Sequence, residues 1–181
     1  STIETSFIVS RSLAVGGPFV QVGTVASTSS ATTGTAYSFT EVGLAASTQY
    51  FYEIKASVTG NNSLALTGNV TTAACSGPTG LKLIPGDYAT LTLALADINS
   101  LGLTGPVTLE LQAGYTSAGE TFPLVINNNA CPNAITIRPA VTGLSVTSAN
   151  ATATFSVDGG DNVTFDGRVG GLGLLKDLVI E

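Results

Sequence analysis

The chain contains no histidine, methionine or tryptophan among its 181 residues. Without an imidazole it cannot build a Ser-His-Asp triad or a histidine-ligated zinc site. Charge is also scarce, because only 10% of the residues are charged, with 6 basic against 12 acidic side chains. The basic residues are scattered along the sequence, so no patch exists of the kind that nucleic acid or an anionic membrane requires.

No apolar run is long enough to span a bilayer. The most hydrophobic window, Leu81 to Leu103, is interrupted by Lys82, Asp87 and Asp97. The 44% of hydrophobic residues can still build a core, and a polar complement of Thr, Ser, Asn and Gly is typical of extracellular β proteins. The sequence also lacks an initiator methionine and a signal peptide, which favours a processed product or a piece of a longer polypeptide.

The two cysteines, Cys75 and Cys131, have neither the CxxC spacing of a redox or zinc site nor a histidine to activate them. We therefore expect a structural disulfide, which would imply an oxidising compartment. The alternative is a pair of buried free thiols.

Residues 86–117 are the only stretch in which the hydrophobic period changes from helical to strand-like. Asp87 is a candidate helix cap and Gly102 a candidate helix end. Apolar side chains fall on one helical face at Tyr88, Leu91, Leu95 and Ile98. The segment Val107 to Leu111 then alternates as a half-buried strand does. This pattern predicts a short amphipathic helix that covers the end of a stack of strands.

Residues 1–74 predict a series of short strands separated by turns: Phe7–Ser12, Phe19–Val25, Gln49–Ala56 and Leu64–Thr72. The segments FIVSRSLAVGGPFVQVGTV, YSFTEVGLAASTQYFYEIKASVTG and VTTAAC resemble the later strands of a fibronectin type III domain. Leu44 and Tyr50 match that family's tyrosine corner, in which the Tyr hydroxyl bonds to the loop backbone.

This resemblance implies an incomplete β-sandwich, because the family begins with two further strands and a core tryptophan that the chain lacks. Half a sandwich exposes core side chains and unpaired backbone edges. Two explanations are open: the sequence is a fragment, or a neighbouring domain or subunit donates the missing strand.

Residues 75–85 are rich in Gly and Pro and are a candidate linker. Beyond them we expect strands, in addition to Val107–Leu111, at Leu81–Ile84, Phe122–Ile126, Ala134–Arg138, Ala153–Val157, Val163–Asp166 and Leu175–Ile180. The segments PGDYATLTLALADINSLG, GPVTLELQAGYTS, ITIRPA and ATFSVDGGDNVTFDG resemble the beginning of a right-handed parallel β-helix of the pectate-lyase-like superfamily. The same pattern is similar to β-helix regions of large secreted surface proteins of Gram-negative bacteria, and it implies a capped start over residues 86–181.

The acidic cluster Asp158, Asp161 and Asp166 is the strongest candidate for a metal site, since Ca²⁺ prefers several carboxylate oxygens on one turn. Asp-Gly and Asp-Asn pairs are also ordinary turn formers, and neither an EF-hand loop nor a nonapeptide calcium repeat is present. We expect no other cofactor.

Paired carboxylates could catalyse glycoside hydrolysis or a lyase reaction without histidine, which makes Glu110 and Glu120 candidate catalytic residues. Glu110 is predicted to point outward from its strand, and Glu120 to lie in a turn, both as solvated surface carboxylates. Aromatic Tyr50, Phe51 and Tyr52 could form a sugar-stacking platform, but alternation favours core packing. No catalytic residue is predicted.

The sequence therefore predicts an all-β, non-enzymatic structural or adhesive module of a secreted or cell-surface protein. It would consist of a partial fibronectin III-like sandwich joined to the capped start of a parallel β-helix. One alternative is a filament subunit assembled by donor-strand complementation. Another is a non-catalytic fragment of a carbohydrate-active β-helix enzyme. Expected partners are the neighbouring domain or subunit that completes the sandwich and surface glycans, with no nucleic acid.

Overall fold

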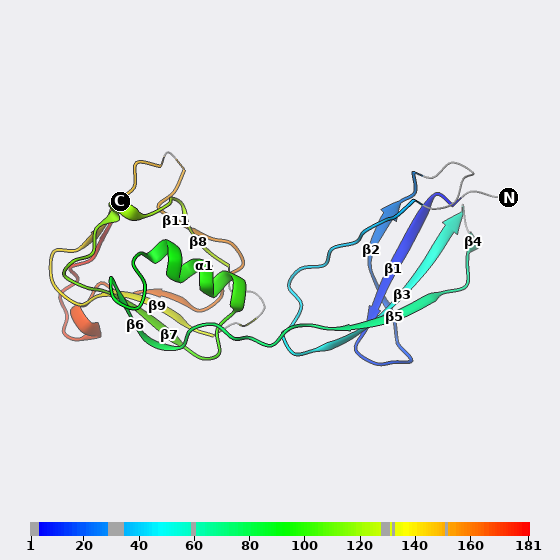
Figure 1. The fold of residues 1–181 in the computed structure, drawn as a ribbon, viewed down its shortest axis with the longest axis horizontal. Coiled ribbons are helices and arrows are strands. Elements are labelled where there is room, and N and C mark those ends of the chain that lie inside the picture. Colours follow the sequence, from blue (N-terminus) through cyan, green and yellow to red (C-terminus); the bar gives the residue numbers. More distant parts are fainter. Residues whose placement is uncertain (1–3, 29–34, 59–60, 128–130, 132, 151) are drawn as a thin grey trace. The chain divides into compact units, whose positions relative to one another are not determined.

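The computed structural model describes residues 4–28, 35–58, 61–127, 131, 133–150 and 152–181. The described residues form a chain of short β-strands with one α-helix, which confirms the predicted all-β fold class (Figure 1). The chain divides into two compact units, Ser1–Ala74 and Cys75–Glu181. None of the described helices is long and apolar enough to cross a membrane.

The first unit is built on one antiparallel sheet. Its strands are β1 (Ser6–Ser12), β2 (Val20–Ala26), β3 (Gln49–Val58), β4 (Asn61–Asn62) and β5 (Leu66–Thr71). The order is β2-β1-β3-β4, and β5 also pairs with β3. The pairing shifts by one residue between Val9 and Ser10 of β1, which leaves Val22 as the extra residue of a bulge in β2.

One face of this sheet is apolar because every second side chain points toward it. Val9 and Tyr50 are buried on it, and residues 37–44 cross it without forming a strand. The Tyr37 ring packs on Phe7 with centroids 4.8 Å apart. A Cβ at Gly23 would lie 2.3 Å from the Phe39 ring, so only glycine allows that ring to approach β2. The crossing segment is therefore fitted closely to the sheet.

The second unit is a stack of parallel strands. They are β6 (Gly80–Ile84), β7 (Val107–Leu111), β8 (Leu124–Ile126), β9 (Ile135–Pro139), β10 (Ser145–Val146), β11 (Phe155–Val157), β12 (Val163–Phe165) and β13 (Val179–Ile180). They form three sheets, ordered β12-β9-β7-β6, β11-β8 and β10-β13. Short 3₁₀ turns η1 (Ser117–Gly119) and η2 (Val169–Gly171) lie between strands. Each circuit of the chain thus lays one strand beside the equivalent strand of the circuit before it.

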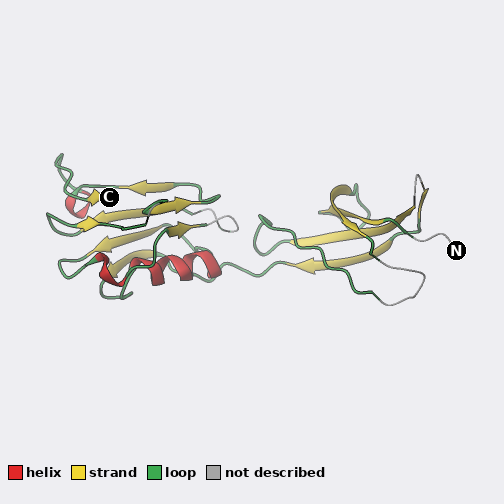
Figure 2. Ribbon diagram, turned by 90° about the horizontal axis from the view of Figure 1, so that it is seen from above, coloured by secondary structure: helices red, strands yellow, loops and turns green. Residues whose placement is uncertain are grey.

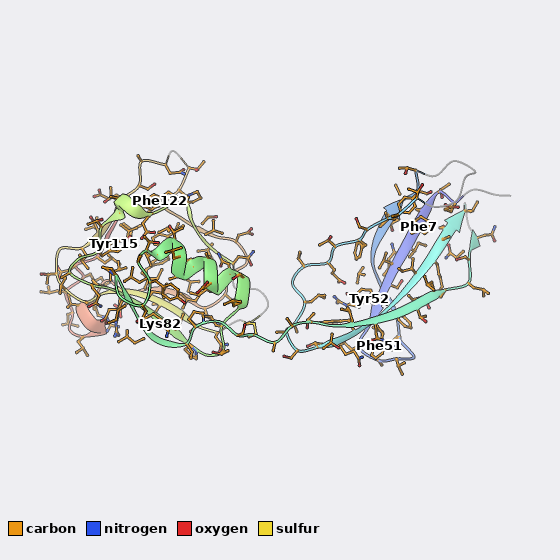
Figure 3. All side chains as sticks on the ribbon, in the orientation of Figure 1. Phe7, Phe51, Tyr52, Lys82, Tyr115 and Phe122 are labelled. Atoms are coloured by element: carbon orange, nitrogen blue, oxygen red, sulfur yellow. A yellow bond between two sulfur atoms is a disulfide. The ribbon has the colours of Figure 1, made fainter. Side chains whose placement is uncertain are left out.

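The stack keeps its register because equivalent apolar residues lie above one another. Val107 pairs with Ile135, which pairs with Val163 on its other side. The buried residues share one central cluster, which contains Ile84, Leu91, Ala94, Leu95, Ile98, Leu103, Val107, Leu109, Leu111, Tyr115, Leu124, Ile126, Ile135, Ile137, Leu144 and Val146. Tyr115 and Phe122, both labelled in Figure 3, belong to this core or pack against it.

The helix α1 (Leu91–Leu101) contributes Leu91, Ala94, Leu95 and Ile98 to this core. The predicted start at Asp87 is wrong, because the N-cap is Thr90, whose hydroxyl accepts from the Leu93 amide. Tyr88 therefore lies in the turn before the helix and not on its face, although it still packs against the core. The helix ends at Gly102, whose φ of 64° favours glycine.

Cys75 and Cys131 form the predicted disulfide, which joins two points 56 residues apart inside the second unit. On the loop-entropy model, closing a loop of this size stabilises the fold by about 4 kcal/mol. A Cβ at Gly102 would lie 2.3 Å from Cys131 Sγ. Glycine at the helix end is thus needed both for its backbone angle and for the space that the disulfide fills.

Strand boundaries differ from the predicted ones mostly at the C-terminal end. Val107–Leu111 is confirmed residue for residue, with the alternating burial that its sequence predicts. The predicted strand Leu175–Ile180 is reduced to Val179–Ile180. Ser145–Val146 was not predicted, because a two-residue strand is too short to show any period.

Candidate functional site

The first strands of the stack have an edge with no strand beside it, and polar side chains occupy that edge instead. Figure 2 shows α1 at this end of the unit and the C-terminal residues at the other. Unpaired N–H and C=O groups along such an edge either recruit another strand or need an internal partner. The closed edge, as we call it here, consists of β6, β8 and β10 with the groups that bond to them.

Asp87 closes β6. Its Oδ2 accepts from the Leu83 amide at 2.8 Å, and the Tyr88 amide donates to the Leu83 carbonyl at 3.3 Å. In a parallel ladder alternate residues bond to the same neighbour, so Leu83 directs both groups away from β7. Asp87 therefore bonds to the edge of β6. It does not cap the helix, which is the role that its sequence position predicts.

Asn99 of α1 closes β8. Its Nδ2 donates to the Val125 carbonyl at 2.8 Å, and its Oδ1 accepts from the Asn127 amide at 2.8 Å. A neighbouring parallel strand would bond to the same two backbone groups. One carboxamide thus replaces a strand at this position.

Ser117 of η1 closes β10 in the same way. Its hydroxyl donates to the Ser145 carbonyl at 3.4 Å and accepts from the Thr147 amide at 2.9 Å. The two backbone groups are again a carbonyl and the amide two residues later. Each of the three sheets therefore has two outward backbone groups bonded by the protein itself on the same side of the stack.

Glu120 fastens the helix to this edge. Its two carboxylate oxygens accept from the Leu91 amide at 2.8 Å and from the Thr92 amide at 2.7 Å, and also from the Thr92 hydroxyl. A carboxylate at a helix N-terminus satisfies free amides and interacts favourably with the helix dipole. The prediction that Glu120 is a solvated surface carboxylate is wrong.

Two tyrosines of this region, Tyr115 and Tyr88, are packed into the core or against it. Burial raises the pKa of the Tyr115 hydroxyl, and the nearby Glu120 carboxylate adds to the effect. Burial likewise raises the pKa of Tyr88, whose hydroxyl donates to Asp97 at 3.0 Å. Both phenols stay protonated at neutral pH. The Tyr88 hydroxyl has its acceptor in Asp97, whereas the Tyr115 hydroxyl is buried without a hydrogen-bond partner among the described residues.

Asp158, Asp161 and Asp166 are not brought together. The described residues contain no group of three or more Asp, Glu, Cys or His side chains placed to hold a metal ion. Asp166 instead accepts from Arg168 Nε and Nη2, each at 2.8 Å. These hydrogen bonds lower the pKa of Asp166 to about 2. The turn residues around Asp158 and Asp161 therefore show no shared binding geometry.

Glu110 is bonded to a basic side chain from the next circuit of the stack. Arg138, 28 residues later, donates through Nε to Glu110 Oε2 at 2.8 Å. The two side chains lie on neighbouring strands in direct register, which is the arrangement in which opposite charges attract across a sheet. Glu110 faces outward as predicted, but as half of an ion pair.

The first unit carries a groove of about 320 Å³ on its apolar face, lined by Val9, Phe39, Glu41, Leu44, Tyr52, Ile54 and Val70. Glu41 forms an ion pair with Arg11 and accepts from the Tyr52 hydroxyl at 2.8 Å. Burial and this bond to Glu41 raise the pKa of Tyr52 to about 12. The groove is thus apolar with an internally neutralised carboxylate.

Tyr50 lies beneath Arg11 and is structural. Its hydroxyl accepts from the Ala45 amide at 2.9 Å, which ties β3 to the segment that contains Leu44. The Arg11 guanidinium stands 5.1 Å from the Tyr50 ring centre, within cation–π range. Phe51, on the opposite face, is half-buried. No aromatic platform for a sugar therefore forms from these three residues.

Comparison with protein-family models, with curated proteins and with solved structures finds no match.

We predict that Asn99→Ala destabilises the second unit by about 1–3 kcal/mol, because it removes the side chain that bonds to a strand carbonyl and a strand amide. Amide exchange measured by NMR should accelerate at Asn127. The control Ser100→Ala, on the same helix but bonded only to the Asp97 carbonyl, should leave that amide protected. Equal protection of Asn127 in both variants would contradict the edge-closing role.

We predict that Asp166→Asn removes an acid-dependent part of the stability. The pKa of Asp166 is lowered in the folded state from 3.8 to about 2, so its contribution is present above pH 3.8 and is lost as the pH falls toward 2. Thermal unfolding followed between pH 2 and 6 should show a smaller acid decrease for the variant. An acid decrease as large as that of the wild type would contradict this prediction.

Proposed function

We propose that the chain is a non-enzymatic structural module of a secreted or cell-surface protein. Its task would be to hold a binding surface away from the cell. The observation that carries the proposal is the closed edge, at which Asp87, Asn99, Ser117 and Glu120 all bond within the protein. Side chains that could act on a substrate are thus used to hold the stack. Parallel stacks with satisfied backbones make stiff supports.

The disulfide and the composition support an extracellular location. Disulfides persist in oxidising compartments, and the Cys75–Cys131 bond lies within the second unit. An acidic chain with few charges also fits the Ser/Thr/Asn-rich surfaces of extracellular β proteins.

We further propose a relationship for each unit. Two observations support a fibronectin III-like origin for the first: the strand order β2-β1-β3-β5, antiparallel throughout, and the Tyr50 hydroxyl bonded to the Ala45 amide. Three parallel sheets joined circuit by circuit support a β-helix start for the second.

Two measurements test the main proposal. Incubation with acidic and neutral polysaccharides should release no new reducing or unsaturated ends. On intact cells that produce the protein, an impermeant amine reagent should label the exposed Lys176, and lysis of the cells should not increase the labelling. Catalytic turnover, or labelling only after lysis, would overturn the proposal.

A second candidate, a subunit that receives a strand from a neighbour, is favoured by the first unit alone. On the apolar face Ile54 is 37% exposed, Leu66 72% and Val70 49%. This part of the face is not covered by the crossing segment, and a donated strand with alternating apolar residues would bury it.

Sedimentation velocity tests this second candidate. The chain should form larger species, and Ile54→Lys should convert them to a smaller one, because a charge cannot be buried in the groove. Val42→Lys is the control, since Val42 is 85% exposed and lies outside the groove lining. A wild-type chain that remains monomeric at every concentration would rule this candidate out.

A further inference from the structure

The Cys75–Cys131 disulfide lies at the point where the chain enters the stack. Cys75 is the first residue of the second unit and directly follows Ala74, the last residue of the first. Any tension between the two units therefore reaches the stack through the backbone of Cys75. The inference below rests on the proposed function, because a module that holds a binding surface away from a cell is pulled at its ends.

The disulfide crosses one circuit of the stack. Strands β6, β7 and β9 belong to consecutive circuits, because they are neighbours in one sheet. Cys75 precedes β6 and Cys131 precedes β9. Gly102, which precedes β7, lies against both sulfurs, since a Cβ there would be 2.3 Å from Cys131 Sγ and 3.6 Å from Cys75 Sγ. The bond thus reaches from the first circuit to the third over a residue that has no side chain.

This covalent bond changes the path that tension follows. With the disulfide closed, the shortest covalent path from Cys75 to the residues after Cys131 runs through the two sulfurs. Residues 76–130 then form a loop beside that path and carry no tension. The loop contains β6, α1, β7, η1 and β8. It also contains the side chains that close the edge and hold the helix, namely Asp87, Asn99, Ser117 and Glu120.

Without the disulfide the same tension would act on the end of an edge strand. In its sheet β6 has one neighbour, β7. The residues that lead into β6 are held by single hydrogen bonds: the Ser76 amide donates to the Leu101 carbonyl at 3.0 Å, and the Thr104 hydroxyl donates to the Gly77 carbonyl at 3.1 Å. Tension on Cys75 would load these bonds first and then the ladder between β6 and β7.

With the disulfide, tension acts instead on a strand inside the sheet. Strand β9 lies between β7 and β12, so two ladders must break before it can leave. Arg138 on β9 adds an ion pair to Glu110 on β7. A strand with two neighbours is therefore loaded in place of a strand with one.

We propose that the disulfide carries tension from the first unit past the first two circuits of the stack, so that α1 and the closed edge stay unloaded. The mechanical resistance then depends on β9 and its two neighbours. A small dithiol removes this protection: it is oxidised to its own disulfide, and its two hydrogen atoms appear on the thiols of Cys75 and Cys131. Tension then passes to β6.

The experiment is single-molecule pulling of the full chain between its N-terminus and residue 141. Val141 follows β9 and is 37% exposed, so an azide-bearing amino acid at this position can carry a handle without a new cysteine. Unfolding of the second unit should extend the chain by about 200 Å more after reduction, the length of the 56 residues that the disulfide spans. The first unit contains no cysteine, so its own step should not change.

The lifetime at fixed force tests the proposal itself. The oxidised second unit should last about tenfold longer than the reduced one, because one or two more hydrogen bonds must break in the rate-limiting step. A chain that combines Cys75→Ser with Cys131→Ser should behave like the reduced chain without any dithiol. This variant separates the loss of the bond from other effects of the reductant.

Two substitutions identify the strand that is loaded in each state. Thr104→Val removes the hydroxyl that holds Gly77, and it should shorten the lifetime about fivefold only after reduction, since a bond that is intact in the transition state does not affect the unfolding rate. Glu110→Gln removes the ion pair between β7 and β9, and it should shorten the lifetime of the oxidised chain.

Other outcomes overturn the proposal. Equal lifetimes of the oxidised and reduced chains would show that the disulfide does not protect the stack. An effect of Thr104→Val that is the same in both states would show that the residues before β6 carry tension in both. If either variant fails to fold, the two redox states of the wild-type chain still decide. None of these results depends on where the protein is located, so the cell-labelling experiment can fail or succeed separately.

Discussion

The structure of the second unit depends on one constraint: each strand at the edge of a parallel stack has backbone groups that point toward a neighbour that is not there. At the closed edge this constraint is met in three sheets by three different groups, from the β6–α1 turn, from α1 itself and from η1. Each group bonds where the preceding circuit would have placed a strand. The helix is therefore a substitute for a strand, with an apolar face toward the core and Asn99 toward the backbone of β8.

The same constraint explains why Glu120 belongs to the turn after η1. A helix beside a strand edge must be held in position along its own axis, or Asn99 would lose its register with Val125 and Asn127. Glu120 fixes the first turn of α1 through two amides, and Gly102, packed against the disulfide, fixes its end. Both ends of the helix are thus tied to later circuits of the chain.

Sequence reasoning reached the elements whose signal is local. The alternation in Val107–Leu111 and the helical spacing of Leu91, Leu95 and Ile98 are visible within a few residues, and the structure contains both. Glu120 escaped prediction because its partners lie 29 and 28 residues earlier in the chain, and Asn99 because its partners lie 26 and 28 residues later. Asp87 was assigned to the wrong element because a helix cap and a strand-edge acceptor call for the same carboxylate.

The chemistry of each closing group decides whether it can satisfy a strand edge alone. A strand edge presents a carbonyl and an amide together, so a single side chain can satisfy it only by donating and accepting at once. Carboxamides and hydroxyls do both, whereas a carboxylate only accepts and an ammonium only donates. Asn99 and Ser117 accordingly act alone, while Asp87 satisfies the Leu83 amide and leaves the carbonyl to the Tyr88 amide. At the closed edge a carboxamide or a hydroxyl can therefore serve alone, where a carboxylate needs a second group beside it.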